Sequence, residues 1–150
     1  MTLYDKLDVI ADSYIPIIFL YSIYKIIVYT IKSKSEGAIK LIQLTTLISV
    51  VYIVQSIDNK YQIWLSYTHD YSTHTAFSLA IVYFYIYSDL KSKLIITASF
   101  LCYLLLMLYQ KYHTITDILT TIAILSPAMY YISYYAKKQL TRRSNGTNNP

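Results

Sequence analysis

Five continuous apolar stretches separated by short polar segments dominate the pattern of this chain. They cover residues 13–31, 41–57, 74–88, 94–109 and 114–136. Continuous stretches favour helices, because a transmembrane barrel would need shorter segments of alternating polarity. A helix rises about 1.5 Å per residue, so the first stretch would be about 28 Å long, close to the hydrocarbon thickness of a bilayer. The pattern predicts an all-α, polytopic membrane helix bundle with about five transmembrane helices.

The composition agrees with a single membrane domain. Hydrophobic residues make up 55% of the 150 residues and charged residues 14%, and the mean hydropathy of +0.38 argues against a soluble globule. Residues 1–12 are polar and acidic and lack the basic region of a secretory signal, so we expect the first apolar stretch to be retained, with Pro16 in its first turn. One domain is predicted over residues 1–136, followed by a disordered basic tail at 137–150.

The basic residues divide unequally between the two sets of connections. The set that contains the C-terminus has nine: Lys32, Lys34, Lys40, Lys91, Lys93, Lys137, Lys138, Arg142 and Arg143. The other set has only Lys6, Lys60 and Lys111. By the positive-inside rule the C-terminus is cytoplasmic and the N-terminus lies outside, in a bacterial inner membrane or its equivalent. The net charge of +5 then reflects membrane orientation, and no nucleic-acid partner is expected.

Two polar motifs begin the third and the fifth apolar stretches, on the same predicted side. His113 and Asp117 are four residues apart, so on a helix they share a face and can hydrogen-bond. A carboxylate fixes the tautomer of an imidazole and leaves its other nitrogen as a base or nucleophile. His74 follows Ser72 and Thr73, which are suitable N-caps, and a helix N-terminus attracts phosphate. A histidine at that place could protonate an oxygen that leaves phosphorus.

These motifs resemble a known superfamily. Ser72-Thr73-His74-Thr75 resembles the second motif of the type 2 phosphatidic acid phosphatases, usually Pro-Ser-Gly-His, and His113-Thr-Ile-Thr-Asp117 resembles their third motif. The motif His113-Thr-Ile-Thr-Asp117 is also similar to that of the sphingomyelin synthases, which belong to the same superfamily. The resemblance covers residues 60–119 and implies phosphoryl transfer without metal or cofactor. It implies that His113 attacks phosphorus, that Asp117 orients His113, and that His74 protonates the departing alcohol.

The resemblance further implies a phospholipid or isoprenoid phosphate substrate at the extracytoplasmic face of the membrane. The arginines that normally grip phosphate in this superfamily have no counterpart, because Arg142 and Arg143 are the only arginines in the chain. Met107 stands six residues before His113, where the superfamily has an arginine. Lys60 and Lys111 would then supply positive charge beside the phosphate, together with Ser72 and Thr73 at the helix N-terminus.

Three alternatives stay open at the level of sequence. The chain could be a phospholipid head-group phosphotransferase, as the likeness to sphingomyelin synthases suggests, or a catalytically degenerate membrane protein of the same fold, as the missing arginines suggest. A third alternative is a metal site at the outer face, for which His69 and Asp70 would join His74, His113 and Asp117. The spacing of these residues is not typical of a metal motif.

Overall fold

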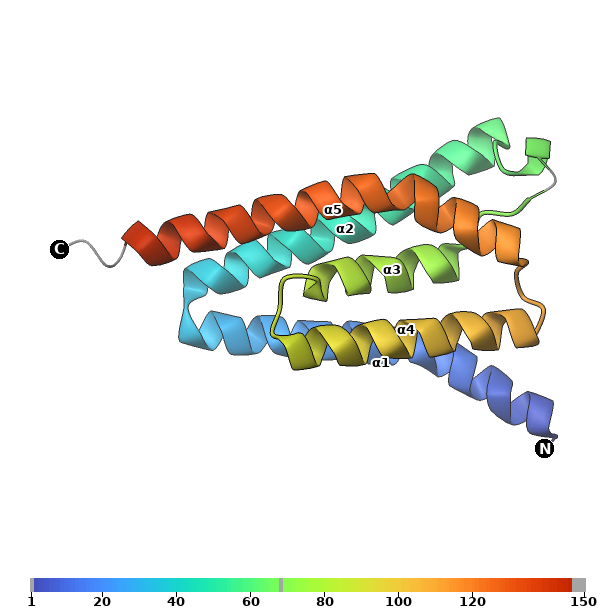
Figure 1. Ribbon diagram of the computed structural model, residues 1–150, viewed down its shortest axis with the longest axis horizontal. Helices are drawn as coiled ribbons and strands as arrows, with labels where there is room; N and C mark the ends of the chain where they lie inside the picture. Colours follow the sequence, from blue (N-terminus) through green and yellow to red (C-terminus); the bar gives the residue numbers. More distant parts are fainter. Residues whose placement is uncertain (1, 68, 147–150) are drawn as a thin grey trace.

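The computed structural model describes residues 2–67 and 69–146, and within them the chain is all-α, as predicted. Its helices are α1 (Leu3–Lys32), α2 (Lys34–Tyr61), α3 (Thr73–Tyr85), α4 (Leu90–Tyr109) and α5 (Ile115–Gly146), with a 3₁₀ turn, η1 (Leu65–Tyr67), between α2 and α3. Consecutive helices run in opposite directions (Figure 1). The N-terminus, the α2–α3 loop and the α4–α5 loop therefore lie at one end of the bundle, here called the loop end. The α1–α2 turn, the α3–α4 connection and the C-terminus lie toward the other end.

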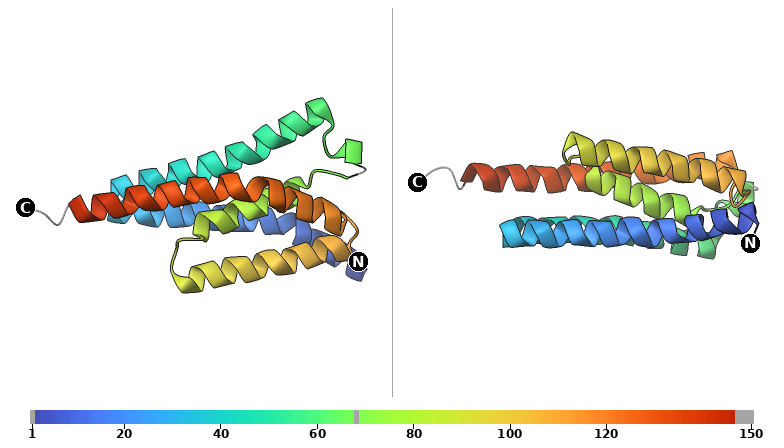
Figure 2. Two further views of the ribbon diagram at one scale, coloured as in Figure 1. Left: turned by 45° about the horizontal axis from the view of Figure 1, so that its top comes forward. Right: turned by 90° about the horizontal axis from the view of Figure 1, so that it is seen from below.

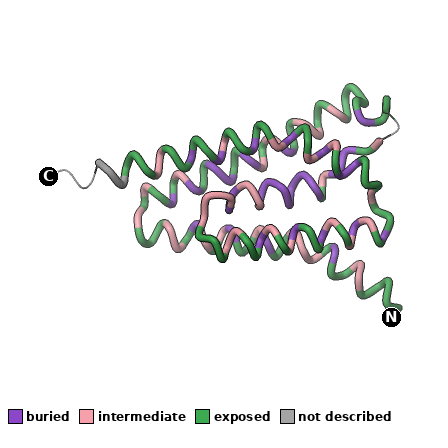
Figure 3. The backbone as a smooth tube through the Cα atoms, viewed as in Figure 1, coloured by how far each residue is buried: buried purple, intermediate pink, exposed green. Residues whose placement is uncertain are grey.

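Helix α3 is the centre of the bundle. In Figure 2 it lies between a layer made of α1 and α2 and the helices α4 and α5 on its other side, and it contacts all four of them. Every residue from Thr75 to Ile81 is buried, followed by Phe84 and Tyr85, so that Figure 3 shows α3 as the most continuously buried helix. A helix that is apolar on all sides requires neighbours on all sides, which is why the other helices surround it.

Four helices, α1, α2, α4 and α5, are long and apolar enough to cross a membrane by length and composition. The sequence predicts five such crossings, and α3 is the exception. Its 13 residues rise only about 20 Å, less than the hydrocarbon thickness of about 30 Å. Its N-terminus is set back from the ends of α4 and α5 at the loop end (Figure 1). The expected stretch 74–88 is shorter at its C-terminal end because the chain leaves helical geometry after Tyr85.

The first helix begins earlier than the apolar pattern predicts. Thr2 is its N-cap, and Thr2 and Asp5 form a capping box in which each side chain accepts from the other residue's backbone N–H. Pro16 consequently lies in the interior of α1, not in its first turn as expected. Proline removes one backbone hydrogen bond inside a helix and bends it. Figure 1 shows the N-terminal part of α1 inclined to the rest of the helix.

The basic connector expected at residues 32–40 is a single-residue turn. Ser33 ends α1, and its side-chain oxygen accepts from the Glu36 N–H to cap α2. Gly37 thus lies within the first turn of α2, against α1. A Cβ added there would collide with the Thr30 side chain and stand 2.7 Å from the Thr30 Cα. Glycine is what allows the two backbones to approach so closely.

At the C-terminal end, α5 continues ten residues past the expected boundary. Residues 137–146 are helical, where the sequence predicts a disordered tail, and residues 147–150 lie outside the described part of the chain. Lysine, glutamine, leucine and arginine are strong helix formers, and neither glycine nor proline interrupts 137–145. Arg143 also donates a hydrogen bond to Ser35, near the α1–α2 turn.

The packing at Gly37 makes a direct prediction. Gly37→Ala would lower the free energy of unfolding by about 1–3 kcal/mol, because the new methyl group meets the α1 backbone. Lys34→Ala, in the same turn but exposed, is the matched control and would change stability by less than about 0.5 kcal/mol. Unfolding of the purified protein in detergent measures both. Equal stability of the two variants would contradict the close approach.

Candidate active site

His74 lies in the first turn of α3. Ser72 caps this helix by accepting a hydrogen bond from the Thr75 N–H, 3.2 Å away, and its own N–H donates to the Thr121 hydroxyl on α5 at 3.2 Å. The side chains of Ser72, Thr75 and Thr121 are fully buried. No hydrogen bond joins the N–H of Thr73 or of His74 to another described residue. Free N–H groups at a helix N-terminus favour an anion, so this end of α3 suits phosphate.

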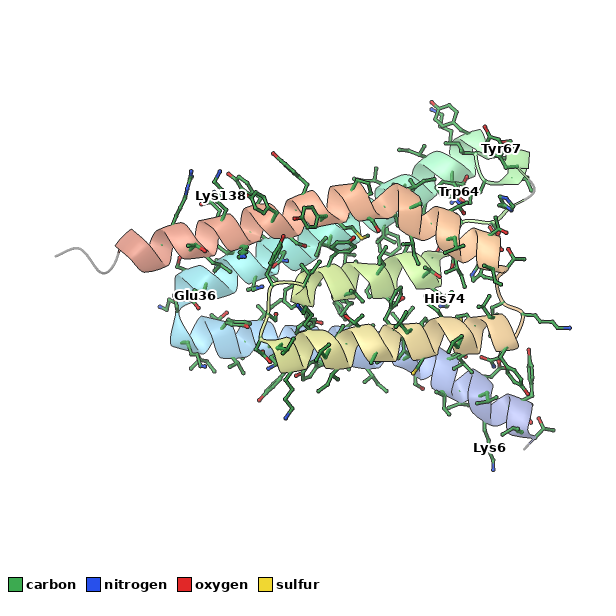
Figure 4. The ribbon with its side chains drawn as sticks, in the orientation of Figure 1. Lys6, Glu36, Trp64, Tyr67, His74 and Lys138 are labelled. Carbon is green, nitrogen blue, oxygen red and sulfur yellow. The ribbon has the colours of Figure 1, made fainter. Side chains whose placement is uncertain are left out.

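The His74 ring is held by a tyrosine of α4. Its Nδ1 lies 3.1 Å from the Tyr103 hydroxyl, and Figure 4 shows His74 between α3 and α4. Tyr103 is buried and stacks on Tyr14 of α1, with ring centroids 4.2 Å apart. A hydrogen bond at one ring nitrogen fixes the orientation of an imidazole and the role of its other nitrogen. With Nδ1 occupied by Tyr103, Nε2 of His74 is the nitrogen left to exchange a proton.

His113 lies in the loop between α4 and α5, one residue before the cap of α5, and is half-buried. The turn that leads to it ends α4: Tyr112 N–H donates to Met107 C=O and Lys111 N–H to Leu108 C=O. These two bonds make a Schellman motif, with Lys111 in the left-handed conformation (φ 59°) that glycine usually occupies. His113 is therefore positioned by a rigid turn and not by the first turn of α5.

Asp117 is buried and binds backbone rather than His113. Its Oδ2 accepts from the Thr114 N–H at 2.8 Å, and its own N–H donates to the Thr114 hydroxyl at 3.2 Å, which caps α5. Its Oδ1 accepts from the Asp70 N–H at 2.9 Å. The nearest imidazole nitrogen recorded is Nδ1 of His69, at 3.8 Å. The hydrogen bond expected between His113 and Asp117 is absent from the described residues, and His113 Nδ1 is buried without a partner. The reason is that His113 precedes α5, where the four-residue spacing no longer places two residues on one face.

Both loops of the site are fixed by aromatic and polar contacts. In the α2–α3 loop, the Trp64 indole donates to Thr120 at 3.1 Å and packs edge-on against Tyr71 at 5.1 Å. In the α4–α5 loop, Gln110 and Tyr112 both donate to the Asp8 carboxylate of α1, at 2.7 and 2.6 Å. The second of these bonds raises the pKa of Tyr112 to about 12. The two loops are thus tied to α5 and to α1 respectively.

The structure brings His74 and His113 together. Their ring centroids are 6.4 Å apart, and the rings are tilted by 52°. Two imidazoles that engage one phosphorus, one by attack and one through an oxygen, need ring nitrogens about 5–7 Å apart. Residues 39 positions apart in sequence therefore bring their rings to a centroid separation that falls within this range.

Burial sets the protonation of His113. Desolvation lowers the pKa of the imidazole below its ordinary value, and the negative charges of Asp70 and Asp117 oppose this shift only in part. The neutral form consequently dominates at pH 7. A neutral imidazole has the lone pair that nucleophilic attack requires.

Neither of the two lysines expected beside phosphate makes a hydrogen bond to His74 or His113 in the described part of the chain. The Lys60 ammonium lies 5.2 Å from the centroid of the Tyr61 ring and borders a groove between α1 and α2. Lys111 is exposed in its turn, two residues from His113. Arg143 lies toward the opposite end, against Ser35.

The metal alternative has no geometric support. Among residues 2–67 and 69–146, no group of three or more His, Cys, Asp or Glu side chains is arranged to hold an ion. His69 pairs with Asp117, whereas His74 faces Tyr103. The five residues proposed for that site thus divide between different partners.

Two contributors to the site have no signal in the sequence. Tyr103 is one of 19 tyrosines, and only the packing of α3 on α4 distinguishes it. Thr121, which receives the Ser72 N–H, follows the motif that contains Asp117 but does not belong to it. Both lie on helices whose apolar pattern predicts burial but not the partner.

No protein-family model, no curated protein and no solved structure matches this chain.

Asp117 accepts hydrogen bonds from two backbone N–H groups, so we expect its substitution to have a large effect on stability. Asp117→Ala would lower the free energy of unfolding by about 2–4 kcal/mol, because two backbone N–H groups lose their acceptor. Thr116→Ala, the exposed neighbour in the same turn, is the control and would change it by less than about 0.5 kcal/mol. Thermal unfolding in detergent compares them. A loss of stability that is no larger in Asp117→Ala than in Thr116→Ala would show that Asp117 does not hold these two backbone segments.

Lys111 carries both a positive charge and a left-handed backbone conformation, and two substitutions there distinguish the two effects on stability. Lys111→Gly would raise the free energy of unfolding by about 1 kcal/mol, because glycine adopts a positive φ without steric cost. Lys111→Ala removes the same charge but keeps the strain, so its stability would stay near that of the parent protein. Denaturant titration distinguishes the two variants. A Lys111→Gly variant less stable than Lys111→Ala would contradict the assigned conformation.

Proposed function

We propose that this protein is an integral-membrane, metal-independent phosphatase that hydrolyses a lipid phosphate or diphosphate through a phosphohistidine intermediate. One observation carries the proposal: His74 and His113 lie with ring centroids 6.4 Å apart at the N-terminus of α3, where the Thr73 and His74 N–H groups have no hydrogen-bond acceptor among the described residues. A nucleophile, an acid and an anion-binding helix end thus converge at one place. The likeness of both motifs to the type 2 phosphatidic acid phosphatases supports the same assignment.

In the first step, the substrate phosphate binds at the N-terminus of α3, where the Thr73 and His74 N–H groups and the helix dipole favour negative charge. His113 attacks phosphorus through Nε2, since Nδ1 is the buried nitrogen. A P–N bond forms and the bond from phosphorus to the lipid oxygen breaks. His74 donates its proton to that oxygen, so the lipid leaves as an alcohol, or as a monophosphate when the substrate is a diphosphate.

In the second step, water replaces the lipid. His74, now neutral, accepts a proton from water as the water oxygen attacks phosphorus, and the P–N bond breaks. Inorganic phosphate leaves, and both histidines return to their starting forms. The Tyr103 hydroxyl keeps the His74 ring in place through both steps. Asp117 contributes by fixing the turn that carries His113, through the Thr114 N–H.

The membrane arrangement is part of the proposal. With consecutive helices antiparallel, nine basic residues fall toward the end that contains the C-terminus and three toward the loop end. The positive-inside rule then makes the loop end, with the two histidines, extracytoplasmic. The recessed start of α3 would let a lipid reach the histidines laterally from the bilayer, between the longer helices.

A head-group phosphotransferase is the second candidate, and one feature favours it. A polar cavity of about 270 Å³ lies beside the site, lined by Asp58, Asn59, Gln62, Leu65, His69 and Asp70. An acceptor alcohol bound there could replace water in the second step. Transfer would then regenerate a phosphate ester rather than free phosphate.

Phosphate release tests the proposed function. Purified protein in mixed micelles with a lipid phosphate should release inorganic phosphate without added metal. His113→Ala should abolish release, and His74→Ala should reduce kcat about 10²–10⁴-fold through loss of the general acid. The acid limb of the kcat/KM profile should lie below the ordinary histidine value, because burial lowers the pKa of His113 and its neutral form is the active one.

His69→Ala is the matched control, since this imidazole faces Asp117 and not the phosphate position; it should retain more than half of the activity. Release that persists in His113→Ala, or that depends strictly on zinc, would contradict the proposal. Label that appears in a new phospholipid instead of free phosphate would favour the phosphotransferase. A parent protein that gives neither product would favour the degenerate alternative.

A further inference from the structure

The carboxylate that orients the histidine nucleophile need not be the one four residues after it. Asp117 directs one oxygen to the Asp70 N–H and the other to the Thr114 N–H. Each is a charge-assisted bond to backbone and therefore among the stronger hydrogen bonds in a protein. Both Asp117 oxygens are thus engaged with backbone, one in the cap of α5 and one in holding the α2–α3 loop, and neither makes a hydrogen bond with His113 among the described residues.

His113 nevertheless needs a partner. Its Nδ1 is buried, with no hydrogen-bond partner among the described residues. A buried donor without an acceptor costs about 1–3 kcal/mol. The cost becomes larger when the ring takes on positive charge as a phosphohistidine forms, because a buried charge requires a counter-charge.

Asp70 is placed to be that counter-charge. The Asp117 carboxylate accepts the Asp70 N–H at 2.9 Å with one oxygen and the Thr114 N–H at 2.8 Å with the other. Thr114 directly follows His113, so this one carboxylate holds the backbone of Asp70 close to the backbone of the His113 turn. Asp70 is exposed, and its side chain makes no recorded hydrogen bond or ion pair within the described ranges. It is thus free to turn toward the ring.

The charges around His113 favour the same residue. Of the two negative charges that raise its pKa, Asp70 acts more strongly than Asp117, while His74 acts in the opposite direction. The titratable groups that face His113 come from three elements: Asp70 from the α2–α3 loop, His74 from α3 and Asp117 from α5. The nearest further ionisable groups in the α4–α5 loop are Lys111, which is exposed, and Tyr112, which pairs with Asp8.

We infer that Asp70 is the positioning carboxylate of His113, accepting an imidazole N–H and balancing its positive charge, while Asp117 serves as the backbone clamp that presents both residues. The inference rests on the proposed function for its catalytic meaning. Its physical content, a coupling between Asp70 and His113, holds whether or not the protein turns over a substrate. The sequence directs attention to Asp117, because the four-residue spacing assumes that His113 is helical.

The test is the titration of the three histidines by NMR in the purified, folded protein in micelles, with the His113 signal assigned by its loss in His113→Ala. Asp70→Asn removes the charge and keeps the backbone N–H that Asp117 binds, so the fold is retained. The pKa of His113 should fall in Asp70→Asn, because a negative charge that stabilises the imidazolium is gone. It should fall less in Asp117→Asn, and Asp70→Glu should restore the parent value.

Asp89→Asn is the matched control, because it removes one negative charge from the α3–α4 connection and asparagine still caps α4. Its His113 titration should be that of the parent protein. Asp70→Ser is a second variant with the backbone N–H intact, and should give the same fall as Asp70→Asn. A His113 titration unchanged in both Asp70 variants, or a larger fall in Asp117→Asn, would overturn the inference.

Activity gives an independent readout. If the proposed phosphatase reaction occurs, the acid limb of the kcat/KM profile should move to lower pH in Asp70→Asn, with reduced kcat and an unchanged thermal midpoint. An inactive parent protein with a normal Asp70-dependent titration would contradict the proposed function but leave the inference standing. An active protein whose acid limb does not move in Asp70→Asn would overturn the inference and leave the function standing.

Discussion

The site depends on one buried carboxylate. Asp117 accepts hydrogen bonds from the backbone of two segments that are far apart in sequence, the α2–α3 loop at Asp70 and the α4–α5 loop at Thr114. These are the segments that lead directly to His74 and from His113. Because the acceptor is charged and only 5% exposed, both bonds are strong, and losing either leaves a buried group unsatisfied. A single side chain thereby sets the relation between the two histidines.

The short central helix explains why such a clamp is needed. With 13 residues, α3 ends before its neighbours do, so its N-terminus cannot be positioned by helix packing at the rim of the bundle. Polar contacts do this instead. Ser72 donates to Thr121 of α5, and His74 meets Tyr103 of α4, which in turn stacks on Tyr14 of α1. Buried polar networks of this kind specify one arrangement because an incomplete one is costly.

Much of the architecture follows from the sequence, and the failures have physical causes. The apolar stretches predict the helices, but they mark the part of each helix that is apolar and not where its hydrogen bonding stops. Thr2 and Ser33 extend α1 and α2 through caps made of polar residues. A stretch of apolar residues also does not reveal whether lipid or protein surrounds it, and α3, surrounded by protein, was expected to cross the membrane.

For the site, the sequence predicts which histidines come together but not the partners that hold them. His74 and His113 were expected to meet because antiparallel helices return the chain to the same end, and the structure places them together. The partnership of His113 with Asp117 was expected from helical spacing, and Thr114 prevents it by capping α5 one residue after His113. Contacts such as that between His74 and Tyr103 depend on how helices pack, which spacing along one helix does not encode.

The central claim is that one phosphoryl group contacts both histidines. Orthovanadate, which adopts the geometry of phosphorus under attack, is the most direct probe, and NMR of the three histidines in the parent protein is the measurement. Titration with vanadate should shift the His74 and His113 signals together, with a single dissociation constant, and leave His69 nearly unchanged. Shifts in only one of the two rings, or separate dissociation constants for them, would contradict a shared phosphate site.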